Sequence, residues 1–202
     1  MSLGLIIVLV VIWYYYKIPR KDQIDTQAIP NAYCIESNNE MPMQDHYECA
    51  AFSSAFVLRN FGVDADGQKL YEKYPRKLLD GTISPKGIIV FFQRLGYDAS
   101  YLRGDIDTLK KQISLGTPVI MFIRVNPKQR YLHFVPVVGY DETHFYLVDS
   151  LSHTINCNEA HYNRKISFRE LEGLWRTWLP FCQNSYIVVK HKEKHRVGEA
   201  DD

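Results

Sequence analysis

A cysteine in a setting that suits nucleophilic chemistry lies in the segment Gln44-Asp-His-Tyr-Glu-Cys49-Ala-Ala-Phe. Apolar residues recur at helical spacing from this point, which predicts that Cys49 lies in the first turn of a helix. Free backbone N–H groups and the positive end of the helix dipole favour the thiolate there, the nucleophilic form, whereas the charge of Glu48 opposes it. The Cys49 amide and the Gln44 side chain are candidate donors to an oxyanion. The alternative for Cys49 is a small buried residue without chemistry.

A histidine and an aspartate that can support such a nucleophile lie in residues 131–150. Two apolar runs flank a Gly-Tyr-Asp-Glu-Thr turn, which predicts a β-hairpin. With the turn centred on Asp141, His133 lies directly opposite Asp149, so that the carboxylate can orient the imidazole. A shift of one residue in register would place the two side chains on opposite faces. Pro136 in the first strand favours a sheet edge or a bulge at this point.

The elements that must position these residues follow from periodicity and capping. We expect helices over residues 49–61, 84–96, 105–116 and 167–175, where Ser84, Asp105 and Ser167 are the caps. Strands are expected over residues 118–125, 132–139, 144–149 and 185–189. Helices first and strands later are typical of an α+β domain. The predicted organisation is a linker at 22–43, a catalytic domain at 44–190 and a charged tail at 191–202.

The overall charge and the amino terminus limit the class of protein. With 24 basic and 23 acidic residues among 202, the chain lacks the positive footprint of a general nucleic-acid binder. Residues 3–11 are all apolar and are followed by a Trp-Tyr cluster and three cations, which predicts a membrane anchor at residues 1–21. A cleaved signal is disfavoured because no basic residue precedes this run, and a buried amino-terminal helix is the remaining alternative. The cations follow the anchor, which predicts a catalytic domain on the cytoplasmic face.

The residues above, taken together, resemble a known family. Gln44, Cys49-Ala50, Leu95-Gly96-Tyr97, Gly116-Thr-Pro-Val119 and His133 to Asp141 followed by Asp149-Ser150 look like the papain-like cysteine peptidases of the bacteriocin-processing (double-glycine leader) type, and in particular their stand-alone relatives. This resemblance spans about residues 40 to 190. It implies a papain-like fold with Cys49 as nucleophile, His133 as general base and acid, Asp149 as orienter and Gln44 as oxyanion donor.

A second cluster of candidate ligands lies outside this set. His153, Cys157 and His161, with Cys182 as a fourth residue, offer ligands that zinc accepts. Their segment has few helix formers and no apolar stripe, so a polar loop is the preferred interpretation. We therefore expect no metal and no cofactor, and we expect Cys34, Cys157 and Cys182 to be structural.

Three classes of function fit these residues. The first is a membrane-anchored cysteine peptidase that hydrolyses peptides or proteins through a Cys-His-Asp triad and a thioester acyl-enzyme. The second is an acyltransferase with the same triad, because both reactions share every step up to the acyl-enzyme. The third is an inactive papain-like binding module. The sequence does not identify the substrate or a partner transporter.

Overall fold

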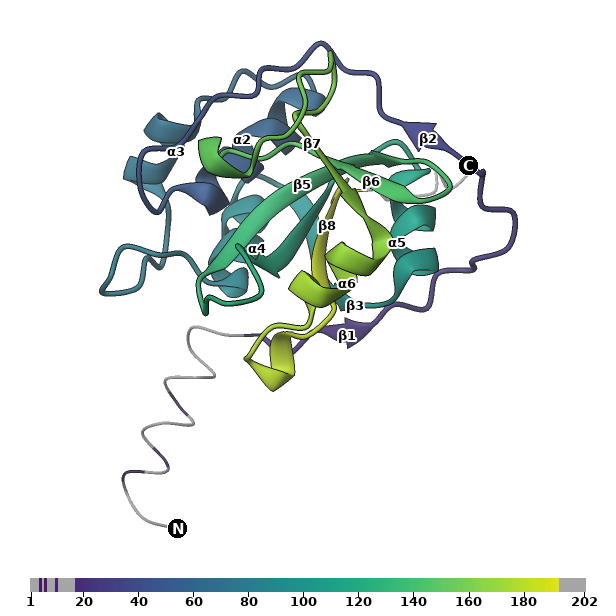
Figure 1. Ribbon diagram of the computed structural model, residues 1–202. Coiled ribbons are helices and arrows are strands. Elements are labelled where there is room, and N and C mark those ends of the chain that lie inside the picture. Colours follow the sequence, from purple (N-terminus) through teal and green to yellow (C-terminus); the bar gives the residue numbers. More distant parts are fainter. Residues whose placement is uncertain (1–3, 5, 7–9, 11–16, 193–202) are drawn as a thin grey trace, which may run out of the picture.

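The computed structural model describes Gly4, Ile6, Val10 and residues 17–192 (Figure 1). Most of the anchor predicted at residues 1–21 lies outside the described residues, as do residues 193–202 of the predicted tail. In the part of the chain that is described, no helix is long and apolar enough to cross a membrane.

A single sheet forms the centre of the described fold. Its strands lie in the order β1-β3-β8-β4-β5-β6-β7, with β2 also paired to β5. All of these pairs are antiparallel except β1 with β3. The strands are β1 (Arg20–Lys21), β2 (Tyr33–Cys34), β3 (Tyr97–Arg103), β4 (Val119–Arg124), β5 (Leu132–Tyr140), β6 (His144–Leu147), β7 (Arg164–Ser167) and β8 (Ser185–His191).

The helices begin at caps that the sequence largely identifies. Ser84 accepts a hydrogen bond from the Gly87 amide, and Asp105 accepts one from the Thr108 amide. Ser167 caps its helix in the same way. The helices are α2 (Cys49–Asn60), α3 (Gly67–Lys73), α4 (Pro85–Arg94), α5 (Ile106–Ile113) and α6 (Phe168–Trp175), with short 3-10 turns at Ser152–Thr154 and Pro180–Cys182. The expected α+β fold is confirmed, but α3, β3 and β7 were not predicted.

Both faces of the sheet are covered by helices, as Figure 1 shows. In β4, Val119 and Met121 lie in a core with residues of α5 and α6. The alternate residues Ile120 and Phe122 lie in a second core with residues of α2 and α4. A strand that is covered on both faces is apolar throughout, which explains the continuous apolar runs of β4 and β5.

Residues 22–43, predicted as a linker, lie against the folded domain. The Asp22 carboxylate is buried and accepts hydrogen bonds from Gln112 Nε2 at 2.7 Å and Tyr186 Oη at 2.6 Å. Further along, the Ile35 amide donates to the Val138 carbonyl at 2.8 Å, next to the pairing of β2 with β5. Two-residue strands and single side-chain hydrogen bonds produce no hydrophobic periodicity. The sequence therefore does not indicate that this segment packs on the domain.

The predicted register of the hairpin is wrong. The turn is centred between Glu142 and Thr143, because Tyr140 pairs with Phe145 and the Asp141 amide donates to the His144 carbonyl. Strand β6 ends at Leu147, so Asp149 does not pair directly with His133, whose partner on the other side of β5 is Ile123.

A β-bulge nevertheless returns the two side chains to the same face. The register shifts between Val137 and Gly139, after which Val137 pairs with Leu147. Continuing this register places Asp149 opposite Val135, two residues from His133 and on its side of the sheet. Without the shift Asp149 would face away, because one residue of slip turns every following side chain over. The bulge that Pro136 suggests is therefore present and serves the site.

Candidate active site

Cys49 is the first residue of α2, and its helix begins without a side-chain cap. The Glu48 side chain is turned away from the helix, and its carboxylate accepts from the His46 amide at 2.7 Å. The Glu48 carbonyl accepts the amides of Ala51 and Phe52. Among the described residues no hydrogen bond uses the amides of Cys49 or Ala50. These N–H groups therefore remain available to an anion beside the thiol.

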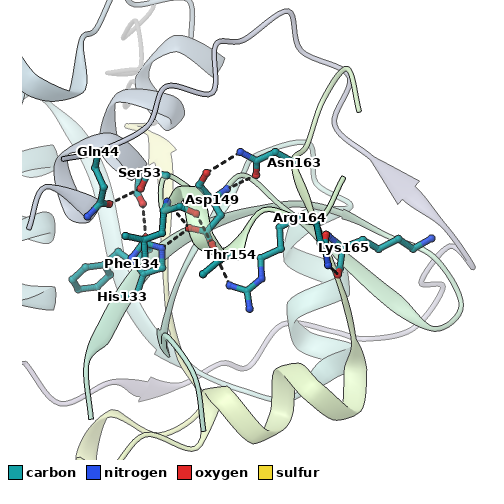
Figure 2. Close-up of polar contacts among 12 residues, drawn as sticks. Gln44, Ser53, His133, Phe134, Asp149, Thr154, Asn163, Arg164 and Lys165 are labelled. Carbon is teal, nitrogen blue, oxygen red and sulfur yellow. Dashed lines mark hydrogen bonds and ion pairs between the residues drawn. The ribbon is translucent and has the colours of Figure 1, made fainter. Parts of the chain in front are cut away.

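Helix α2 is held against the strand that carries His133. Ser53 Oγ donates to the carbonyl of Phe134 at 3.0 Å, and both residues are buried. Figure 2 shows Ser53 beside Phe134, next to His133. This bond fixes the start of α2 relative to β5 and so sets the position of Cys49 relative to the imidazole.

His133 lies between Cys49 and Asp149 and is 2% exposed. Its Nε2 bonds Asp149 Oδ1 at 2.8 Å, which leaves Nδ1 as the ring nitrogen that can serve the Cys49 thiol. Burial lowers the pKa of the imidazole, but the charge and hydrogen bond of Asp149, together with Cys49, outweigh burial and raise the pKa to about 10. The imidazole is therefore charged at neutral pH.

The Asp149 carboxylate has no exposed surface and is held from several sides (Figure 2). Arg164 Nη1 donates to Oδ2 at 2.8 Å, and the Leu151 amide donates to Oδ1 at 3.0 Å. Burial raises the pKa of this carboxyl, but His133, Arg164 and the Leu151 amide outweigh that effect and hold it below its usual range. Asp149 is therefore ionised at neutral pH, where His133 is charged.

Asn163 fixes the backbone of Asp149. Its Oδ1 accepts from the Asp149 amide at 2.7 Å, and its Nδ2 donates to the Asp149 carbonyl at 2.8 Å. Sequence reasoning missed both Asn163 and Arg164. Arg164 is the first residue of β7 and Asn163 directly precedes it, and the pairing of β7 with β6 is not apparent from local patterns.

Gln44 lies at the same site and is held by Ser150. Ser150 Oγ donates to the side-chain oxygen Oε1 of Gln44 at 2.6 Å. The backbone amide of Gln44 donates to the Ser150 carbonyl at 2.9 Å. Gln44 Nε2 donates one of its hydrogens to the His46 carbonyl at 2.6 Å, which leaves the second hydrogen for another acceptor.

A cleft of about 570 Å³ contains Gln44, Cys49 and His133. His46 also lines it. The remaining walls come from the segment before α2, from the loop before α4 and its first residue, from β4 and β5 with their connection, and from the turn after Asp149. Their residues are Tyr47, Leu78, Asp80, Thr82, Ile83, Ser84, Pro85, Phe122, Val125, Gln129, Arg130, Tyr131, Leu132, Phe134, Leu151 and His153.

The second candidate cluster does not form a site. Cys182 is buried in the core that contains residues of α2 and α4. His161 Nδ1 donates to the Ser37 carbonyl at 3.1 Å. In the described part of the chain, no three His, Cys, Asp or Glu side chains are grouped so as to hold a metal ion. Burial raises the pKa of the thiols of Cys34, Cys157 and Cys182, which disfavours their thiolates.

The fold and this arrangement define a cysteine peptidase domain. The profile of the Peptidase C39 family matches residues 38–186, so the chain belongs to that family. The resemblance noted in the sequence is thereby confirmed. A comparison with the curated proteins gave no match.

Solved structures show the same fold. The peptidase domain of Streptococcus ComA, a bifunctional ABC transporter of a quorum-sensing pathway, superposes with a TM-score of 0.61 at 17% identity, covering 77% of this chain and 100% of that one. A C39-like peptidase from Bacillus anthracis gives 0.61 at 18%, covering 80% and 98%. A double-glycine motif protease of an AMS/PCAT transporter, solved with its leader peptide, gives 0.56 at 18%, covering 79% and 94%.

The raised pKa of His133 predicts how stability depends on pH. Between about pH 6.5, where an unfolded histidine titrates, and about pH 10, the folded protein holds a proton that the unfolded chain releases. The free energy of unfolding contributed by His133 is therefore complete below about pH 6.5 and lost as the pH rises through about 10. Urea unfolding at pH 6, 8 and 10 measures this contribution. The free energy of unfolding of wild type should exceed that of Asp149→Asn by less and less as the pH rises. Parallel pH profiles for the two proteins would contradict the assignment.

Proposed function

We propose that this chain is a membrane-anchored cysteine peptidase that hydrolyses peptide bonds with Cys49 as nucleophile, His133 as acid and base, Asp149 as orienter and Gln44 as oxyanion donor. The observation that carries the proposal is the buried pair of His133 and Asp149, next to a thiol at the start of helix α2 in the same cleft. Cys49 and His133 both line the cleft, which leaves the thiol accessible to a substrate chain.

In the first half-reaction the Cys49 thiolate attacks the carbonyl carbon of the scissile peptide. The S–C bond forms and the C=O electron pair moves to oxygen, where the Cys49 amide and the second Nε2 hydrogen of Gln44 stabilise the charge. The C–N bond then breaks as His133 Nδ1 delivers its proton to the leaving amine. The products of this half-reaction are a free amine and a thioester on Cys49.

In the second half-reaction water attacks the thioester. His133 Nδ1, now neutral, takes a proton from the water as the C–O bond forms. The tetrahedral oxyanion collapses, the C–S bond breaks, and the thiolate and imidazolium are restored with release of a carboxylic acid. Asp149 remains ionised and holds the ring throughout, which is the orienting role of the third group in such triads.

The walls of the cleft support a peptide or protein substrate. Apolar side chains of β4 and β5 line the cleft together with polar groups such as Asp80 and Arg130, which suits an extended chain with mixed side chains. One relative was solved with its leader peptide, and we propose that this chain also takes an extended peptide segment. No step requires a metal or a cofactor.

Acyl transfer and loss of turnover are the alternatives. A thioester that an amine intercepts before water gives acyl transfer with the same residues. Product analysis with and without an added amine distinguishes this reaction from hydrolysis. An inactive binding module would not label at Cys49 faster than at Cys157 with a thiol-directed probe.

The anchor is a separate part of the proposal. Residues 3–11 are apolar, and the cations Lys17, Arg20 and Lys21 follow, which supports attachment with the domain on the cytoplasmic side. Asp22, the next residue, is bonded to Gln112 and Tyr186 of the domain. An anchor that ends there would hold the peptidase domain close to the bilayer.

The first test removes the groups that carry out the chemistry. Cys49→Ala and His133→Ala should each lower kcat/KM by about 100-fold or more, because nucleophile and acid-base group are lost. Cys157→Ala is the matched control and should retain wild-type activity. The assay uses a library of quenched fluorogenic peptides that includes Gly-Gly sequences. Wild-type activity should be bell-shaped in pH, and full activity of Cys49→Ala would refute the proposal.

The second test concerns the anchor. Deleting residues 2–16, which leaves β1 in place, should move the protein from the membrane fraction to the soluble fraction with its peptidase activity retained. Val8→Lys keeps the full length but places a charge in the apolar run at a cost of about 3 kcal/mol, and it should weaken membrane association similarly. Full-length wild type recovered in the soluble fraction with an intact amino terminus would contradict the anchor.

A further inference from the structure

Two consecutive residues, Asp149 and Ser150, contact two different groups of the site. The Asp149 side chain bonds His133 on β5. The Ser150 side chain bonds Gln44, which is 106 residues away in sequence and lies just before α2. Ser150 is 8% exposed, so its hydroxyl is nearly removed from solvent. The orientation of a buried hydroxyl is then set by the partner that it finds in the protein.

The contacts of Gln44 fix which end of its amide faces which neighbour. The His46 carbonyl can only accept, so the amide nitrogen rather than the oxygen must face it. Ser150 Oγ lies against the amide oxygen at 2.6 Å, and the Ser150 carbonyl accepts the backbone amide of Gln44 at 2.9 Å. The side chain is thus held at its oxygen while one N–H remains free.

We propose that Ser150 is a positioning residue that holds the Gln44 amide so that its free N–H points to the developing oxyanion. This inference rests on the proposed peptidase function, because it concerns an interaction that strengthens in the tetrahedral state. Without the hydroxyl, Gln44 keeps its bond to the His46 carbonyl but loses the restraint on its oxygen. The amide then samples other rotamers, and a donor displaced by a fraction of an ångström stabilises the oxyanion poorly.

The same arrangement links the two halves of the site. Asn163 bonds the backbone amide and carbonyl of Asp149, and Ser150, the residue after Asp149, bonds Gln44. The orientation of the imidazole and the direction of the oxyanion donor are therefore set by a single rigid dipeptide. A shift of this dipeptide would disturb acid-base chemistry and charge stabilisation together.

The test compares a peptide aldehyde that ends in Gly-glycinal with the corresponding peptide alcohol. The aldehyde forms a hemithioacetal with Cys49: the S–C bond forms, the C=O electron pair moves to oxygen and the thiol proton is retained within the site. The oxygen then occupies the oxyanion position, whereas the alcohol binds without a covalent bond. Ser150→Ala should weaken aldehyde binding about tenfold and leave alcohol binding unchanged.

Two further variants separate positioning from general support. Gln44→Ala should weaken aldehyde binding at least as much as Ser150→Ala, and the double variant should be no worse than Gln44→Ala alone. Thr154→Val is the matched control: Thr154 Oγ1 bonds the Leu151 carbonyl in the same segment and does not touch Gln44. It removes one hydroxyl bond and should leave aldehyde binding unchanged.

The outcomes distinguish this inference from the proposed function. If wild type binds the aldehyde no better than the alcohol, the peptidase proposal itself fails. If wild type prefers the aldehyde and Ser150→Ala retains that full preference, or loses aldehyde and alcohol binding equally, the positioning role is overturned. Additive losses in the double variant with Gln44→Ala would overturn it as well.

Discussion

The Asp149 carboxylate has no contact with solvent, and a buried charge of this kind is tolerated only when other groups replace the water that it has lost. His133, Arg164 and the Leu151 amide supply those interactions. Removing one member of such a set costs several kcal/mol, since it leaves an uncompensated charge. The carboxylate therefore has two roles. It keeps the imidazole charged, and it connects β7 and the turn after β6 to the strand that carries His133.

The sheet is built to bring this carboxylate to the right face. The turn that starts β6 gives a register in which Asp149 would point away from His133, and the bulge between Val137 and Gly139 corrects the facing. A side chain at Gly139 would collide with the carbonyl of Tyr33, since a Cβ there would lie 2.6 Å from it. The close approach of β2 to β5 thus depends on glycine at this position.

Local patterns in the sequence predicted much of this site, whereas contacts between residues distant in the chain were not predicted. Helix α2 follows from apolar spacing, and Cys49 was placed at its start correctly. The contact between His133 and Asp149 was predicted for a reason that proved wrong. Pro136 indicated a bulge in β5, but the apolar residues on both faces of this strand do not show which register follows from it. Arg164 and Ser150 act on residues distant in sequence, and neither carries a motif that shows its partner.

The most direct measurement of the central claim compares two aspartates that both pair with a cation, one in the turn of the β5–β6 hairpin and one just after β6. Asp149 bonds Arg164 and His133, whereas Asp141 bonds Lys165 at the surface. Steady-state kinetics should show that Asp149→Ala lowers kcat/KM by about 100-fold or more, since the imidazole loses its orienter, and that Asp141→Ala stays near wild type. A severe loss in Asp141→Ala together with a mild one in Asp149→Ala would contradict the account.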